Sequence, residues 1–215
     1  MRQKNVSKEQ VPRTKNIAER TFVDISSIKH KSAGGAKFWA LFMDDCGGFL
    51  IDRFLREKSK LARQGSMLTG KINDQQGNKL KLIRCDNTGE NRNLEEICYK
   101  LGLGTKFEYT IVVTLQQNGR IERKFITLYG RVRSMMIDAG IKEDLRQKLW
   151  AEAANMCVDL TNLLVNNKHD KSSYQSFYKI SKDLDYVNHL RQFGEIGFVL
   201  KRGNKIKSKI SDRGK

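Results

Sequence analysis

The sequence predicts an α/β fold in which helices flank a mixed five-stranded sheet. Three observations lead to this prediction. Short β-branched and aromatic runs dominate the first part of the chain, long stretches with helical spacing dominate the last part, and the two kinds alternate in between. An antiparallel meander followed by strands that return through helical crossovers gives a mixed sheet with helices on its faces.

Five runs of the sequence have the composition of strands. They lie at 21–25, 38–43, 49–55, 79–85 and 107–113. The first three are joined by short connections that contain paired glycines, so they predict an antiparallel meander. The second run is apolar throughout, as expected for a central strand covered on both faces. The fourth alternates leucine with lysine and leads directly into Asp86.

Four stretches have helical periodicity. They lie at 56–68, 91–101, 118–139 and 143–165, with a polar loop expected at 73–78. The third stretch carries one apolar stripe, made of Ile121, Phe125, Leu128, Val132 and Met135. The fourth carries another, made of Leu145, Leu149, Ala153, Met156, Leu160 and Leu163. Ribonuclease H-like domains have this order of strands and helices.

The charge of the chain is strongly unbalanced. Lysine and arginine total 41 against 24 acidic residues, which gives a formal net charge of +17. Such an excess favours a polyanionic partner such as nucleic acid, but other basic proteins share it. Six basic and two acidic residues lie within 1–20, and eight and two lie within 191–215. We therefore expect a basic arm at 1–19, a core at 20–167 and a basic extension at 168–215, with DNA contact and plain solvation both open as roles of the two ends.

Several classes of protein do not fit the sequence. No apolar run is long enough to span a bilayer, and the N-terminus lacks the apolar segment of a signal peptide, so we expect an intracellular protein without a membrane partner. The cysteines form no Cys-x-x-Cys pair and the histidines are scattered, so no zinc site is expected within this chain. Reduced, mostly buried thiols are predicted instead, at Cys46, Cys85, Cys98 and Cys157.

Three carboxylates lie where the predicted fold would gather them. Asp24 is on the first strand, Asp86 is at the exit of the fourth, and Glu122 is in the first turn of the helix that follows the fifth. Carboxylate oxygens suit Mg²⁺ or Mn²⁺, and a pair of such ions clamps the attacking and leaving oxygens in phosphoryl transfer. On spacing and topology alone, three unrelated surface acids explain the pattern equally well.

The segments 115–123 (LQQNGRIER) and 83–91 (IRCDNTGEN) resemble the integrase core of copia-type LTR retrotransposons. Thirty-five residues separate Asp86 from Glu122, and 61 separate Asp24 from Asp86, which fits the Asp, Asp-35-Glu triad of retroviral and retrotransposon integrases. Further matching segments are FWALFMDD, KFITLYGRVRSM, LWAEAAN and LRQFGEIGFV. The resemblance implies that Asp24, Asp86 and Glu122 are catalytic and bind two Mg²⁺ or Mn²⁺ ions.

The resemblance also implies an activity and its setting. It implies a metal-dependent polynucleotidyl transferase that joins the 3′ ends of element DNA to target DNA, as a homo-oligomer, in the nucleus. Two departures bear on activity. Leu115 stands where relatives have proline, and the zinc module of the family would precede this chain, so a polyprotein fragment is expected. A catalytically inactive DNA-binding relic and a ribonuclease H-type nuclease remain as alternatives.

Polar and basic residues surround Glu122 in the sequence. They are candidates for contacts with DNA phosphates or bases: Gln117, Asn118, Arg120, Arg123 and Lys124. The alternatives are helix capping by Asn118 and an ordinary solvated helix face. Leu115 belongs to the segment 110–115 (TIVVTL), whose β-branched residues predict that the fifth strand extends into it.

The Phe-Met-Asp-Asp run that ends at Asp45 also resembles the metal-binding hairpin of reverse transcriptase palms. A palm needs a further metal-binding aspartate well upstream, whereas Asp24 lies too close in sequence. A role in the turn is therefore the preferred interpretation for Asp44 and Asp45.

Overall fold

The computed structural model describes residues 12–76, 80–110, 119–166, 170–180, 185–195 and 197. A five-stranded sheet with the order β3-β2-β1-β4-β5 lies at its centre. The strands are β1 (Arg20–Ser27), β2 (Phe38–Asp44), β3 (Leu50–Leu55), β4 (Leu82–Asp86) and β5 (Lys106–Thr110). β1, β2 and β3 pair antiparallel, whereas β4 runs parallel to both β1 and β5. The predicted mixed sheet is confirmed.

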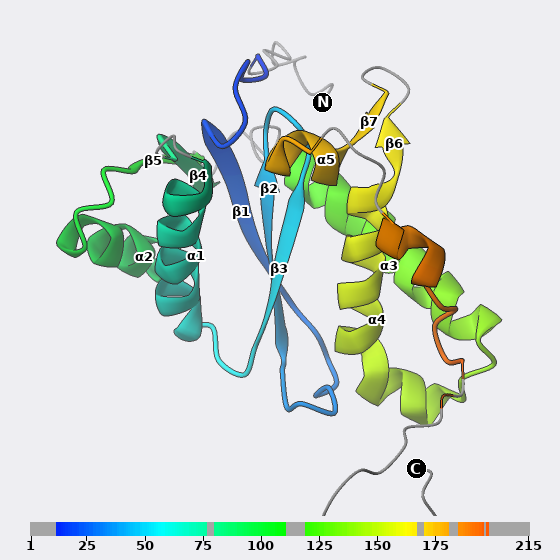
Figure 1. Cartoon of the computed structure of the whole chain (residues 1–215). Helices are drawn as coiled ribbons and strands as arrows, with labels where there is room; N and C mark the ends of the chain where they lie inside the picture. The colour runs from blue at the N-terminus through cyan, green and yellow to red at the C-terminus, as the bar shows by residue number, and fades with distance from the viewer. Residues whose placement is uncertain are drawn as a thin grey trace, which may run out of the picture.

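Helices cover both faces of this sheet (Figure 1). On one side lie α1 (Lys60–Gln76) and α2 (Gly89–Lys100), and on the other lie α3 (Gly119–Asp138) and α4 (Glu143–Leu163). Strand side chains alternate between the two faces, so that Phe22 packs with α3 and α4 whereas Val23 packs with α1. β2 lies inside the sheet and is almost entirely buried, as its apolar run predicts.

Two helices differ from their predicted form. α1 reaches Gln76, so most of the polar stretch expected as a loop is helical. Leu61, Leu68 and Ile72 are buried on one face of it. In α4 the buried face is made by small residues and one tryptophan rather than by the leucines: Trp150, Ala151, Ala153, Ala154, Cys157 and Val158. Small side chains let α4 pack closely on α3 and the sheet, whereas Leu145 is 45% exposed.

The C-terminal region contains elements that the sequence did not predict. They are β6 (Val165–Asn166), β7 (Lys171–Ser172), α5 (Ser173–Tyr178) and the short 3-10 helix η1 (Asp185–His189). The ring of Phe177 stacks on that of Phe49, with centroids 4.3 Å apart, so α5 packs against the core. The predicted extension of β5 falls within 111–118, outside the described residues.

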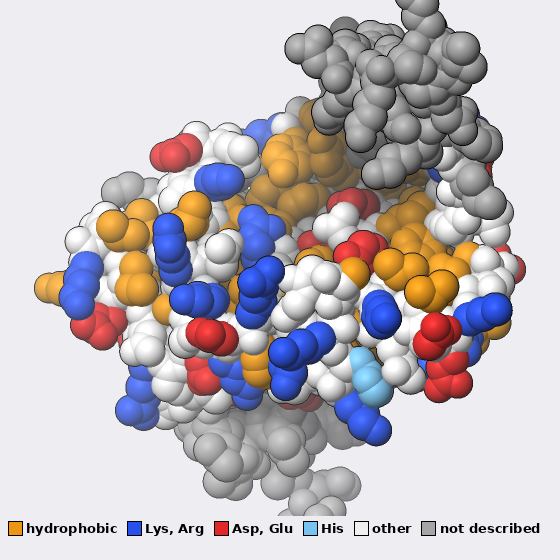
Figure 2. Space-filling view, turned by 90° about the horizontal axis from the view of Figure 1, so that it is seen from below, with side chains coloured by type: hydrophobic (Ala, Val, Ile, Leu, Met, Phe, Trp, Pro, Cys, Tyr) orange, Lys and Arg blue, Asp and Glu red, His pale blue; other side chains and the backbone are white. Residues whose placement is uncertain are grey.

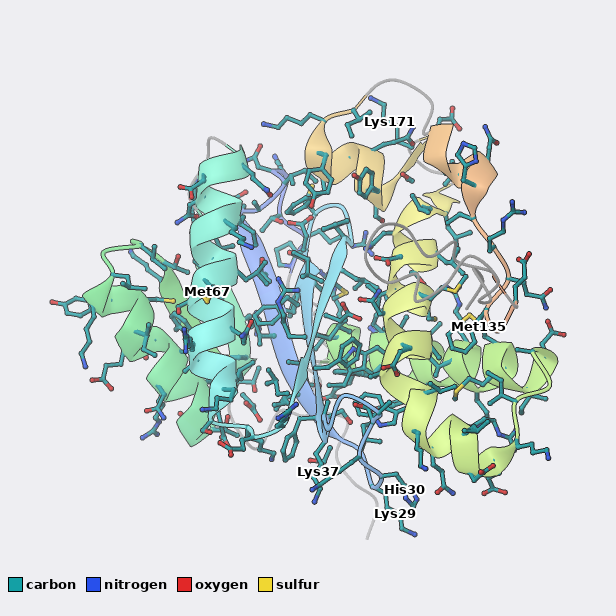
Figure 3. All side chains as sticks on the ribbon, turned by 60° about the horizontal axis from the view of Figure 1, so that its bottom comes forward. Lys29, His30, Lys37, Met67, Met135 and Lys171 are labelled. Carbon is teal, nitrogen blue, oxygen red and sulfur yellow. The ribbon has the colours of Figure 1, made fainter. Side chains whose placement is uncertain are left out.

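The connection between β1 and β2 lies at one end of the sheet (Figure 1). The connection between β1 and β2 carries Lys29, His30 and Lys37, far from Lys171 in β7 (Figure 3). Lysine and arginine side chains are spread over this end of the molecule (Figure 2). Within the described residues, no helix has the length and apolarity needed to cross a membrane.

Candidate active site

Asp24 and Asp86 lie on neighbouring parallel strands. The register pairs Thr21 with Ile83 and Phe22 with Arg84, and its continuation by two residues places Asp24 beside Asp86. Side chains alternate along a strand, so Asp24 shares the α3 face with Phe22, and Asp86 lies on that face because Cys85 packs on the opposite one. The fold therefore brings these two carboxylates together, as the sequence predicts.

Asp86 is held by the beginning of α2. Its Oδ1 accepts hydrogen bonds from the Thr88 hydroxyl at 3.1 Å and from Asn91 Nδ2 at 2.5 Å. Asn91 Nδ2 also donates to the main-chain oxygen of Asp86 at 3.1 Å, and Asn91 is 1% exposed. Thr88 is the N-cap residue of α2, but its hydroxyl points to Asp86 rather than capping the helix. Both donors fix one oxygen of the carboxylate and leave the other without a hydrogen-bond partner among the described residues.

Glu122 is exposed in the first turn of α3, the helix that contacts β1. Its charge acts on Asp24. The pKa of Asp24 is raised to about 6, first by burial and then by the nearby charges of Asp86 and Glu122. The N–H of Ile25, 2.8 Å from Asp24 Oδ1, acts in the opposite direction. The three predicted site residues thus come from three elements, and the charges of Asp86 and Glu122 both act on Asp24.

The donor set suits a hard divalent cation, because all three groups offer carboxylate oxygens. Burial is the main cause of the raised pKa of Asp24, and the charges of Asp86 and Glu122, which a cation would neutralise, add to it. The residues do not form a finished cage. Across the described ranges, no three His, Cys, Asp or Glu side chains are gathered closely enough to hold one ion. The fit to Mg²⁺ or Mn²⁺ lies in the chemistry and charge of the residues, and Glu122 would have to approach the aspartates.

Three basic residues predicted to bind DNA lie in the described part of α3. Arg123 is exposed, whereas Lys124 is half-buried and its pKa is lowered, first by burial and then by the charges of Arg131 and Arg13. Arg120 is paired with Asp45 of the β2–β3 turn. Gln117 and Asn118 lie outside the described residues.

The sequence analysis missed one polar pair beside Asp24. The Tyr129 hydroxyl lies 2.6 Å from Ser26 Oγ, and Ser26 is on the same face of β1 as Asp24. The charge of Asp24 contributes to the raised pKa of Tyr129, after burial, so this phenol is close to the carboxylates. Tyr129 follows Glu122 by seven residues, which places both on one side of α3. This helical spacing was the available signal.

The β2–β3 turn confirms the predicted structural role of Asp44. Its Oδ1 accepts from the Ala18 N–H at 2.8 Å and its Oδ2 from the Gly47 N–H at 2.5 Å, and Gly48 adopts a positive φ of 70° that favours glycine. Asp45 is also part of the turn, but its side chain pairs with Arg20 and Arg120, a connection that the sequence did not predict.

No protein-family model matches the chain. The chain is 31% identical over 150 residues, or 68% of its length, to the retrovirus-related Pol polyprotein from transposon TNT 1-94 of Nicotiana tabacum. It spans 11% of that polyprotein. Two solved structures are similar in fold. The HTLV-2 integrase catalytic core domain in complex with magnesium, in trimeric form, gives a TM-score of 0.53 at 16% identity, over 74% of this chain and 96% of that one.

The second structure is the simian T-cell lymphotropic virus intasome in complex with the PP2A regulatory subunit B56 gamma. It gives a TM-score of 0.60 at 14% identity, over 95% of this chain and 69% of that one. The sequence of the chain is similar to a retrotransposon polyprotein, and its fold is similar to that of retroviral integrases. Both findings are consistent with the observed strand order of the sheet. The chain is therefore related in sequence to a retrotransposon Pol polyprotein and has the ribonuclease H-like fold of retroviral integrase catalytic cores.

Proposed function

We propose that this chain is the core of a copia-type retrotransposon integrase, a polynucleotidyl transferase that joins the 3′ ends of element DNA to target DNA. One observation carries the proposal. Asp24 is largely buried, and the charges of Asp86 and Glu122, which come from two other elements, both act on it. A largely buried aspartate whose pKa is raised beside other acids is typical of sites that bind divalent metal and transfer phosphoryl groups.

Asp24, Asp86 and Glu122 would hold two Mg²⁺ or Mn²⁺ ions. When bound, such ions supply the positive charge that stabilises the attacking and leaving oxygens of an in-line phosphoryl transfer. Thr88 and Asn91 orient Asp86 by fixing its Oδ1. Tyr129 and Ser26 offer hydroxyl groups beside Asp24, where they would contact a sugar or phosphate of the DNA.

DNA is the proposed substrate and partner. Arg123 and Lys124, together with Gln117 and Asn118, are the proposed contacts to it, and the basic ends of the chain would add phosphate contacts. Arg120 was predicted to join them, but its guanidinium group pairs with Asp45. A homo-oligomer and a nuclear site of action are proposed as well, since one similar structure is trimeric and the other is an intasome.

A strand-transfer assay tests the function. The whole chain is incubated with Mn²⁺, the terminal DNA of the element and a supercoiled plasmid as target, beside the Asp86→Asn variant. Joined products with the wild type, and none with Asp86→Asn, support the proposal. Binding of DNA without joining indicates the inactive relic, and cleavage of RNA–DNA hybrids without joining indicates the ribonuclease H-type nuclease.

A further inference from the structure

Arg120 lies in the first turn of α3, two residues before Glu122, and it pairs with Asp45, 75 residues away in the sequence. The side chain of Asp45 is fully enclosed, and that of Arg120 is 26% exposed. Water competes poorly for a carboxylate in such a place, so this contact holds more firmly than an ion pair on the open surface.

Asp45 is itself fixed to the beginning of β1. Its Oδ2 pairs with Arg20, the first residue of that strand, at 3.2 Å, and accepts from the Thr14 N–H at 2.9 Å. The N–H of Asp45 donates to the main-chain oxygen of Arg20 at 3.0 Å. The partner of Arg120 is therefore anchored to the strand that carries Asp24.

A second contact joins Arg120 to the same strand. Its guanidinium carbon lies 6.0 Å from the centroid of the Phe22 ring, within the range of a cation–π interaction. Phe22 precedes Asp24 by two residues and lies on the same face of β1. One side chain thus ties the first turn of α3 to the β2–β3 turn and to the strand of Asp24.

The first turn of α3 is sensitive to such a contact. Helix ends fray, and Gly119, where α3 begins, has no side chain that could fix the turn. Glu122 lies in this turn. A rotation of α3 by about 5° about its axis would move a carboxylate that is about 6 Å from the axis by about 0.5 Å, which is the tolerance of a functional constellation.

We propose that Asp45 and Arg120 are positioning residues for Glu122: their ion pair places the first turn of α3 relative to Asp24 and thereby sets the affinity of the site for divalent metal. The inference rests on the proposed function, because it takes Asp24, Asp86 and Glu122 as the metal-binding residues. It also gives Arg120 a role other than the predicted contact with DNA phosphates.

Arg120→Gln provides the test, because Asp45 keeps Arg20 and Thr14 as partners and no buried charge is left alone. The rise in Tm of the whole chain is followed in a Mn²⁺ titration without DNA. We expect the apparent Kd for Mn²⁺ to increase at least tenfold, which corresponds to about 1.4 kcal/mol. Asp45→Asn should have the same effect, and Arg120→Lys, which retains the charge, should recover at least half of the loss on a logarithmic scale.

Asp44→Asn is the matched control. It removes a buried carboxylate from the same turn, but Asp44 accepts from Ala18 and Gly47 and not from α3. We expect a lower Tm in chelator and an unchanged Kd for Mn²⁺. An equal loss of Mn²⁺ affinity in Asp44→Asn and Arg120→Gln would overturn the inference, because the titration would then report only general stability.

Two further results decide between the possibilities. Unchanged Mn²⁺ affinity in Arg120→Gln overturns the positioning role, and weaker DNA binding in that variant would restore the phosphate contact. Asp86→Asn identifies the source of a failure. If Asp86→Asn keeps the full rise in Tm with Mn²⁺, both the proposed function and this inference are wrong. If it loses the response while Arg120→Gln behaves like the wild type, only the positioning role falls.

Discussion

Asp24 and Asp86 stand side by side on adjacent parallel strands, with both carboxylates on the face that α3 covers. Burial raises the pKa of Asp24 to about 6, and the charge of Asp86 raises it in the same direction. At neutral pH the metal-free protein therefore holds negative charges that repel one another where water screens them poorly. A divalent cation that binds only the folded state would relieve this repulsion and stabilise the fold.

Asp86→Asn should melt higher than the wild type in chelator, by about 2–4 °C, since the change removes one charge at nearly constant volume. The Asn side chain keeps an oxygen that accepts from Thr88 and Asn91, so packing should be preserved. The same variant should lose most of the stabilisation by Mn²⁺. Two thermal melts, in chelator and in Mn²⁺, measure both effects.

The control for this experiment is Asp74→Asn on the exposed face of α1. It removes the same charge far from the site, so both melts should match the wild type. A lower Tm of Asp86→Asn in chelator, together with a full response to Mn²⁺, would make Asp86 a structural residue.

Asp52→Asn should change how stability depends on pH. The pKa of Asp52 is raised from 3.8 to about 6, first by burial and then by the charge of Asp159. Because the folded-state pKa lies above the unfolded value, the bound proton stabilises the fold below pH 3.8, and this stability is lost as pH rises through about 6. Asn at this position carries no such charge.

The variant should therefore gain about 2 kcal/mol over the wild type at pH 7 and little at pH 3.5. Urea unfolding at the two pH values measures the difference. Buried Oδ2 of Asp52 has no hydrogen-bond partner in the described part of the chain, so ionised Asp52 is poorly compensated there, and the Asn side chain removes its repulsion with Asp159. An equal gain at both pH values would show that packing, and not ionisation, is responsible.

Asn162→Ala should destabilise the edge of the sheet. Asn162 of α4 accepts from the Leu50 N–H at 2.9 Å and donates to the Leu50 oxygen at 2.8 Å, so its amide acts as a neighbouring strand for β3. Both atoms are buried, and the change would leave two main-chain groups without partners. The expected cost is about 3 kcal/mol, or about 6–12 °C in Tm.

Asn155→Ala is the comparison for Asn162→Ala. Asn155 lies on the same helix and is exposed, and the hydrogen bond that its side chain donates within the described residues goes to Asp159. Its loss should change the free energy of unfolding by less than about 0.5 kcal/mol. Similar costs for the two variants would mean that α4 loses helix stability in both, and that the contact with β3 contributes nothing specific.

DNA binding should weaken steeply with salt. The chain has a formal net charge of +17, so several phosphate contacts are expected. Affinity for a random duplex should fall at least about tenfold between about 50 and 200 mM salt, as measured by fluorescence anisotropy. A flat response over this range would contradict DNA as the partner.

Local periodicity was enough to predict the order of strands and helices, because alternation and helical spacing are properties of short segments. The same reasoning placed Asp24 and Asp86 on strands that prove to be neighbours, and Glu122 in the first turn of the helix after the fifth strand. It was less reliable for helix faces. At the end of the apolar stripe of α3, Met136 is buried rather than the predicted Met135. In α4, alanines rather than the predicted leucines face the core. In such helices two overlapping sets of apolar residues could face the core, and the packing against the rest of the protein decides which set is buried.

Two long-range contacts were decided by the tertiary structure alone. Asp45 and Arg120 are 75 residues apart, and Asn162 and Leu50 are 112 apart. Patterns within a short segment therefore cannot predict either pair. Asp44 and Asp45 are identical neighbours in sequence, yet one holds its own turn and the other holds the helix of Glu122. Their roles separate because successive residues in the folded chain point in different directions, toward partners that the fold alone brings within reach.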